Sequence, residues 1–436
     1  MLVYLLFILL FLNLWIIYQK TKDVICPPFL FGSGLCVASF VELFYIKEWD
    51  LQNLEFRTFW IIIVGVYLFS ITYFLLMSFQ RSKKQSTISV SVDNFVVLRK
   101  SYARINIFLM LSVFLQLFVI YIKLKTQVAV FGSLLSFEQL LAEANASTIG
   151  ERDVITYPTI YYYLAGFCKA FFYYYSFFLV TIILDKTNKY KINLPLLIAN
   201  IMLGLFLVIL NGNRGSVVEL LFVLIILYVS RYVLIYRHRI SYKIFLIFCL
   251  VFLAFYSLLN VSASWMGRNI SEQDFNSSYY SAVYCGSQIK NLQDMTSKSV
   301  NKKDIIGSST LRRLYKDLGI KKNEIERGEF LYTNGYFMGN VYTTFYNFYD
   351  DGKMSGVVFF CLLMSIISFF SYVNNGNSTY KLGLYDMLYT KIGFALFMSF
   401  FSCKFFEEII CVNMIRQIVY FLLSMYFINN YVLLKK

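Results

Sequence analysis

Histidine, proline and charged residues are scarce in this sequence. Its 436 residues include one histidine, His238, and four prolines, and 15% of the chain is charged. A soluble protein with so little polar surface would precipitate, so the composition excludes an ordinary soluble domain. The lone histidine and the eight cysteines, which have no CxxC spacing, do not form the clusters typical of metal sites, so neither a metal nor another cofactor is expected.

Long apolar runs make up most of the chain instead. Hydrophobic residues account for 58% of it, and the runs have too few polar interruptions for the alternating strands of a membrane barrel. The predicted fold is therefore all-α, a polytopic integral membrane protein with about eleven membrane helices. The runs cover roughly residues 1–19, 24–46, 57–79, 104–122, 158–184, 192–210, 215–236, 244–262, 354–373, 382–403 and 413–432.

Lysine and arginine are concentrated in alternate loops between these runs, whereas acidic residues such as Glu48 and Asp153 fall in the other loops. The positive-inside rule then predicts an outer amino terminus and a cytoplasmic carboxyl terminus. These loops also account for the formal net charge of +15, so no nucleic-acid partner is predicted. The basic loop residues include Lys20, Arg81, Arg104, Arg231 and Lys436.

The runs divide the chain into three segments. The middle segment is hydrophilic and nearly neutral, and it is expected to fold as a large cap on the outer face. Short amphipathic helices are predicted at 311–318 in this cap and at 137–144 in an earlier outer loop. The segments are 1–262, with eight helices, an outer loop at 123–157 and an outer hairpin at 211–216; 263–353, the cap; and 354–436, with three helices.

A single arginine, Arg214, lies in the polar gap between two apolar runs. The gap consists of Asn211-Gly212-Asn213-Arg214-Gly215-Ser216. A guanidinium that is even partly buried there loses hydration and normally has an anionic partner. Glycines on both sides leave the backbone open to a bulky ligand. The alternative is an ordinary turn with an arginine that extends to the interface.

Four charged residues interrupt apolar runs, namely Glu42, Lys169, Glu219 and Lys391. Such residues normally face a protein interior or a water-filled cavity. Glu219 follows Arg214 by five residues, so it either holds the arginine, belongs to a proton pathway or forms a buried ion pair. Lys169 either meets a phosphate or belongs to a buried ion pair.

Two short blocks carry a family resemblance. Asn213-Arg214-Gly215 at the start of an apolar helix resembles the Ser/Asn-Arg-Gly motif of the oligosaccharide repeat-unit polymerases, the Wzy family. Gly339-Asn340-Val341-Tyr342-Thr343 and the later turn at 348–356 resemble that family's Gly-x-Asn-x-Tyr-Thr segment and Tyr-x-Asp-Phe-Gly-x-x-Gly turn. Asp351 and Gly356 match the turn, whereas Lys353 stands where glycine is usual and Gly352 replaces phenylalanine.

The resemblance implies a GT-C-like glycosyltransferase of the bacterial plasma (inner) membrane that makes O-antigen, capsule or another surface polysaccharide. Donor and acceptor are oligosaccharides linked to undecaprenyl diphosphate, and the other partners are membrane lipid, a chain-length regulator and a flippase. Fixed guanidinium groups suit a departing diphosphate. The candidate site residues are Arg214 and Asp351 for catalysis, Arg214, Arg268 and Lys169 for diphosphate binding, and Glu219, Gly215, Asn340 and Tyr342 in support. Arg268, Lys169 and Glu219 are included for their positions after or within apolar runs, and the others for the motif blocks.

Alternatives stay open for the function and for single residues. A related O-antigen ligase is expected to carry an outer-face histidine, but His238 falls in a cytoplasmic loop. A flippase or transporter of lipid-linked sugars is expected to show paired halves, and no repeat is visible. Arg268 also suits contact with lipid phosphates, and Asp351 suits a helix cap. The sequence identifies no catalytic base.

Overall fold

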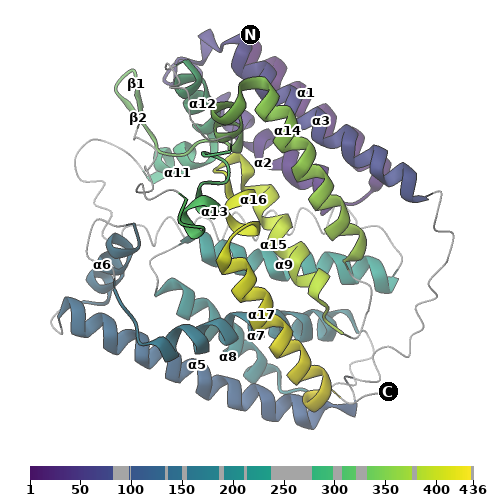
Figure 1. Ribbon diagram of the computed structural model, residues 1–436, viewed down its shortest axis with the longest axis vertical. Helices are drawn as coiled ribbons and strands as arrows, with labels where there is room; N and C mark the ends of the chain where they lie inside the picture. Colours follow the sequence, from purple (N-terminus) through teal and green to yellow (C-terminus); the bar gives the residue numbers. More distant parts are fainter. Residues whose placement is uncertain are drawn as a thin grey trace. The chain divides into compact units, whose positions relative to one another are not determined.

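The computed structural model describes residues 1–81, 98, 100–132, 136–149, 155–185, 191–210, 214–236, 277–297, 307–320, 331–375 and 381–433. Within these ranges the chain is predominantly helical and forms two compact units (Figure 1). Unit 1 comprises Met1–Thr87, Phe275–Asn374 and Lys391–Met414, and unit 2 comprises Ile88–Asp274, Asn375–Thr390 and Ile415–Lys436.

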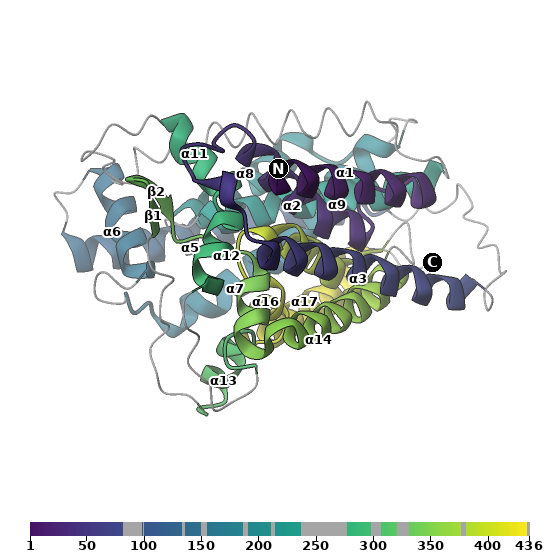
Figure 2. The same cartoon turned by 90° about the horizontal axis from the view of Figure 1, so that it is seen from above.

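Unit 1 is built around three long helices. Helix α3 packs along both α1 and α14, and Figures 1 and 2 show α14 running beside α3. Phe31 of α2 packs against Phe69 of α3 and Phe345 of α14, with ring centroids 4.7 and 5.9 Å away. The helices are α1 (Leu2–Thr21), α2 (Pro27–Glu42), η1 (Leu51–Asn53), α3 (Phe56–Arg81), α14 (Thr344–Asn374), η3 (Met398–Phe400) and α16 (Lys404–Ile409).

The described part of the predicted cap also belongs to unit 1. It contains α11 (Ser277–Gly286), α12 (Gln288–Ser297), α13 (Arg312–Asp317) and a hairpin of β1 (Leu331–Thr333) and β2 (Tyr336–Gly339). Asn334 and Gly335 connect the strands with φ of 51° and 80°, the conformation that an Asn-Gly turn adopts at low cost. Helix α13 confirms a helix within the segment predicted at 311–318, and the hairpin is an exception to the all-α prediction.

Unit 2 is a second group of packed helices. Helix α7 packs on α5, α8 and α9, and α5 also packs along α8. Its core includes Val119, Ile120, Tyr161 and Leu207. The elements are α5 (Tyr102–Phe131), α6 (Phe137–Ile149), α7 (Thr159–Leu184), α8 (Leu194–Ile209), α9 (Arg214–Tyr236), the first half of α15 (Leu384–Phe397), most of α17 (Val412–Phe427) and the π-helical turn η4 (Ile428–Val432). Helix α6 confirms the helix predicted at 137–144.

Six of the described helices are long and apolar enough to cross a membrane: α1, α3, α5, α7, α9 and α14. The prediction of a helical, membrane-embedded protein is therefore confirmed at this level. The predicted number of eleven spans is not confirmed. Helices α2 and α8, for example, have 16 residues each, fewer than a typical span. The run predicted at 244–262 lies outside the described residues.

One predicted helix end and one loop assignment were wrong. Helix α5 continues to Phe131, so it includes the first residues of the outer loop predicted at 123–157. Arg231, counted above among loop residues, lies inside α9 and is 1% exposed. Both differences have the same origin, because polar side chains inside these helices are buried against partners rather than solvated.

Candidate functional site

Helix α9 begins at Arg214, so the predicted hairpin at 211–216 is shorter than expected. Gly215 and Ser216 are helical rather than part of the polar gap. Residues 211–213 and Arg268 lie outside the described residues. The helix start places the backbone of Arg214 and Gly215 at the end that carries the partial positive charge of the helix dipole. An anion at this position would therefore meet a favourable field.

An ion pair joins α7 to α9 near this end. The Lys169 Nζ lies 3.4 Å from the Glu219 Oε1, and the side chains are 30% and 8% exposed. Glu219 is about 7 Å further along α9 than Arg214 at the usual helical rise. Of the interpretations left open above, the structure shows the ion pair. Lys169 keeps an exposed side, so pairing does not remove its cation from reach of a ligand.

The second motif block forms a break in α14. Gly352 has φ −159° and ψ 20°, and Lys353 has φ 52° and ψ −138°, so α14 consists of two helical segments that meet at this turn. Lys353, which stands where glycine is usual in the motif, therefore has a positive φ. A lysine there is strained by about 1–3 kcal/mol. Its Nζ lies over the Tyr349 ring, 5.1 Å from the centroid.

Asp351 holds a neighbouring loop against this turn. Its Oδ1 accepts a hydrogen bond from the Ser309 amide, and its Oδ2 accepts one from the Thr310 amide, both at 2.8 Å. Asn347 donates to the Ser309 carbonyl at 3.1 Å, and the Ser309 hydroxyl bonds Asp350. Each of its two oxygens thus holds a backbone amide of the neighbouring loop, so its geometry favours a positioning role.

The same loop continues into contacts with α16 and its neighbours. Arg312 Nη2 lies 2.9 Å from the Glu407 Oε1, and Asp317 accepts the Val412 amide at 3.0 Å. Asn340 and Tyr342 lie between β2 and α14, where the Tyr342 ring packs 5.5 Å from that of Tyr346. These two motif residues therefore shape the junction between hairpin and helix.

Asn291 of α12 is a buried residue that the sequence analysis did not identify. Its side-chain amide donates to the carbonyls of Met338 and Val341, at 3.0 and 2.8 Å. These bonds fasten the end of β2 to α12 within the cap. An asparagine in an ordinary amphipathic helix gives no sequence signal for this role, because its partners are backbone groups far along the chain.

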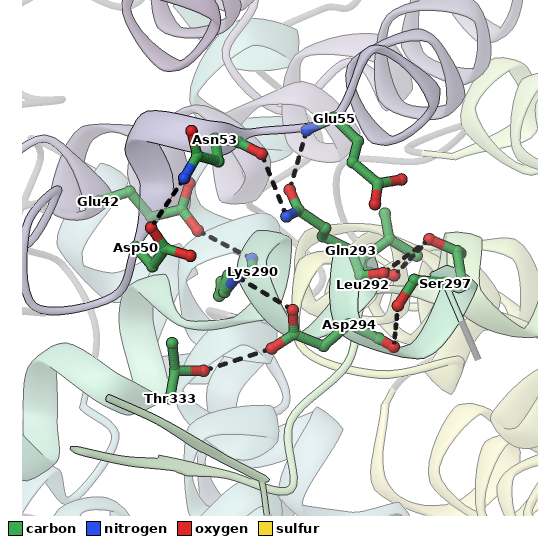
Figure 3. Close-up of polar contacts among 11 residues, drawn as sticks. Glu42, Asp50, Asn53, Glu55, Lys290, Leu292, Gln293, Asp294, Ser297 and Thr333 are labelled. Atoms are coloured by element: carbon green, nitrogen blue, oxygen red, sulfur yellow. Dashed lines mark hydrogen bonds and ion pairs between the residues drawn. The ribbon is translucent and has the colours of Figure 1, made fainter. Parts of the chain in front are cut away.

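A polar network fastens α12 to the membrane-helix part of unit 1 (Figure 3). Glu42, fully buried at the end of α2, accepts the Lys290 amide in the first turn of α12 at 3.1 Å. Lys290 Nζ in turn pairs with Asp294 at 3.1 Å, and Asp294 accepts a hydrogen bond from Thr333 of β1 at 3.3 Å. Glu42 is thus an attachment point for the cap, as expected for an acid facing an interior.

Gln293 and Tyr279 complete the attachment. Gln293 accepts the Glu55 amide at 3.0 Å and donates to the Asn53 carbonyl at 3.3 Å, as Figure 3 shows. Tyr279 accepts from the Trp49 indole at 3.1 Å and donates to the Phe337 carbonyl at 3.0 Å. Burial raises the pKa of Tyr279 to about 12, so it remains a neutral donor at physiological pH.

The predicted site residues therefore fall into two groups. The first group lies in unit 2 and comprises the first two residues of α9, Arg214 and Gly215, and the ion pair of Lys169 with Glu219. The second group lies in unit 1 and comprises Asn340, Tyr342 and Asp351. In the part of the chain that the structure describes, no group of three acidic, histidine or cysteine side chains is placed to hold a metal ion.

No family model, curated protein or solved structure matches this chain. The fold and the apolar helices nonetheless define its class: it is a predominantly helical protein embedded in a membrane.

The positive φ at Lys353 makes a testable prediction about the α14 turn. We expect Lys353→Gly to be more stable than Lys353→Ala by about 1–2 kcal/mol, because alanine keeps the strained backbone and glycine does not. Both variants lose the contact with Tyr349, so that contribution cancels. Unfolding of the purified protein in mixed detergent micelles measures the difference. An alanine variant as stable as the glycine variant would contradict the strain.

Proposed function

We propose that this protein polymerises undecaprenyl-diphosphate-linked oligosaccharide repeat units by glycosyl transfer at the outer face of the bacterial plasma membrane. The observation that carries the proposal is the position of Arg214 as the first residue of the long apolar helix α9, directly before Gly215. A lipid-linked diphosphate bound at the start of this helix would meet Arg214 and Gly215, two of the three residues of the Asn-Arg-Gly motif.

The chemistry of this reaction requires positive charge at the leaving group. The bond between the anomeric carbon and the diphosphate breaks through an oxocarbenium-like transition state, and negative charge develops on the diphosphate oxygens. A guanidinium and a helix N-terminus fixed beside that oxygen stabilise the transition state more than the ground state. The planar fork of arginine matches two phosphate oxygens at once.

Lys169 supports the same site from α7. Its cation pairs with the carboxylate of Glu219, which follows Arg214 by five residues on α9. We assign Glu219 the role of holding Lys169 in place. The lysine, whose side chain is 30% exposed, offers a second contact to the diphosphate.

Asp351 has a positioning role in this proposal. Its two bonds hold residues 309–310 on the α14 turn, and Asn340 and Tyr342 shape the chain just before that helix. The acceptor hydroxyl oxygen forms the new bond to the anomeric carbon as the bond to the diphosphate breaks, and the departing diphosphate takes the electron pair of that bond and the hydroxyl proton. We therefore assign no general base among the residues of the chain.

The proposal is tested on the surface polysaccharide of cells that carry only a variant copy of the gene. We expect Arg214→Ala to lower polymerisation by about 100-fold or more, so that a single exported repeat unit replaces the ladder of chain lengths. Arg214→Lys should retain a small part of the activity, because it keeps the charge and loses the fork. Gel analysis of the polysaccharide, with membrane protein levels matched, measures both effects.

Arg416→Ala is the control, since Arg416 is an exposed arginine of α17 outside either residue group. It should leave the ladder unchanged. Long chains that accumulate unattached would instead identify a ligase, and loss of all exported units would identify a flippase. A normal ladder with Arg214→Ala would refute the role of the arginine.

A further inference from the structure

Unit 2 contains a cavity that none of the motif residues lines. Its volume is about 510 Å³, within the range of small-molecule sites. One wall is a single face of α5, formed by Arg104, Ile107, Phe108, Leu111, Ser112 and Leu115. The other wall comes from Phe171 of α7 and from Phe427, Tyr431 and Val432 at the end of α17 and in η4.

The cavity has a closed floor and an open rim. Phe108 and Ser112 are 6% and 3% exposed, and Phe108 meets the Phe171 ring edge-on at 5.1 Å. Ile107 and Leu111 on the rim are more than half exposed. Tyr431 lies in a π-helical turn, a rare conformation that is found at functional sites more often than elsewhere. The result is an apolar channel that opens sideways along a membrane helix.

The length of this channel matches one half of a membrane. From Arg104 to Leu115 the helix rises about 16 Å at 1.5 Å per residue. Half of a bilayer's hydrocarbon core is about 15 Å thick. A single acyl chain lying along the channel would therefore extend from the headgroup level to the middle of the membrane.

The end of the channel at Arg104 is positively charged. Arg104 is the third residue of α5 and is exposed, so its cation and the positive end of a 30-residue helix dipole act at the same level. The described lining contains no acidic residue to oppose them. A bound lipid would thus place its phosphate beside Arg104 and its acyl chain against Phe108 and Phe171.

We propose that this channel is a specific binding site for an anionic phospholipid of the phosphatidylglycerol type. Arg104 and the first turn of α5 bind the phosphate, and the channel binds one acyl chain. A zwitterionic lipid carries a positive group beside its phosphate, so the same cation attracts it less. The proposal depends only on the protein being embedded in a membrane and not on the polymerase activity.

Native mass spectrometry of the whole purified protein, with phosphatidylglycerol or phosphatidylcholine added, tests the site. We expect phosphatidylglycerol to bind more tightly to the wild type, and Arg104→Ala to weaken it by about tenfold, the loss of one charge-assisted contact. Leu111→Trp, a change at an exposed rim position, should fill the channel and weaken binding by a similar factor.

Lys191→Ala is the matched control. Lys191 lies over the Tyr102 ring, and Tyr102 is two residues before Arg104, hence on the opposite face of α5 at the same level. It should leave lipid binding unchanged. Equal binding of the two lipids, or wild-type binding by either Arg104→Ala or Leu111→Trp, would overturn the proposal. Tighter binding of undecaprenyl phosphate than of phosphatidylglycerol would overturn the assigned lipid.

Discussion

Arg231→Ala is expected to lower the free energy of unfolding by about 3–5 kcal/mol, because it leaves a carboxylate buried without its cation. Arg231 of α9 and Asp386 of α15 pair at 2.8 Å, with side chains 1% and 5% exposed. The guanidinium also donates to the Lys381 carbonyl at 3.4 Å and lies 5.4 Å from the Phe177 ring centroid. Unfolding in mixed detergent micelles measures the loss.

A double substitution separates the pair from the cost of an orphaned charge. Arg231→Met with Asp386→Leu removes both charges and fills similar volume, so it should be more stable than either single variant. Asp386 also accepts the Gly383 amide at 2.7 Å, so every variant with Asp386→Leu loses this hydrogen bond and about 1 kcal/mol of unfolding free energy with it. Arg416→Ala, at an exposed position, should stay within about 0.5 kcal/mol of the wild type. Single variants as stable as the double would contradict this account.

The class of the protein was predictable from its sequence because apolar length alone determines it. The exact ends of the helices could not be predicted, because tertiary contacts determine them. Lys123 and Gln127 resemble the start of a polar loop, yet both are fully buried in α5. They donate to the carbonyls of Leu207 and Leu210 at the end of α8, at 3.2 and 3.0 Å. Carbonyls at a helix end lack helical partners, and these polar side chains satisfy them.

Structure that depends on neighbouring residues could be predicted from the sequence, whereas contacts between residues distant in the sequence could not. The hairpin of β1 and β2 was visible in principle, because Asn334-Gly335 between strand-forming residues is a strong turn signal. The pairing of Arg231 with Asp386 was not, because nothing near either residue indicates the other. The motif block identified Asp351, but its bonds to residues 309–310 follow only from the fold.

At Gly356 the structure explains why the motif has a glycine. A Cβ on Gly356 would lie 2.1 Å from the Phe348 carbonyl oxygen and 3.3 Å from its carbonyl carbon. The break at Gly352 and Lys353 brings the two segments of α14 this close. A glycine is therefore required at this position by contact with the backbone, which cannot move aside as a flexible side chain does.

Gly356→Ala is accordingly expected to cost about 3 kcal/mol in unfolding free energy. The entropy that alanine removes from the unfolded chain offsets only about 0.4–1 kcal/mol of this. Gly352→Ala is the matched control in the same turn, because its Cβ would meet only the Ser355 hydroxyl, at 3.6 Å. It should stay within about 1 kcal/mol of the wild type in the same detergent titration.

The pair of variants also connects the turn to the site. If contact between residues 348 and 356 sets the direction in which Asp351 points, Gly356→Ala should loosen the loop at 309–310 as well as lower stability. Hydrogen exchange at the Ser309 and Thr310 amides should then rise in Gly356→Ala and not in Gly352→Ala. Exchange that stays slow in both variants would show that the contact between residues 348 and 356 does not set the direction of Asp351.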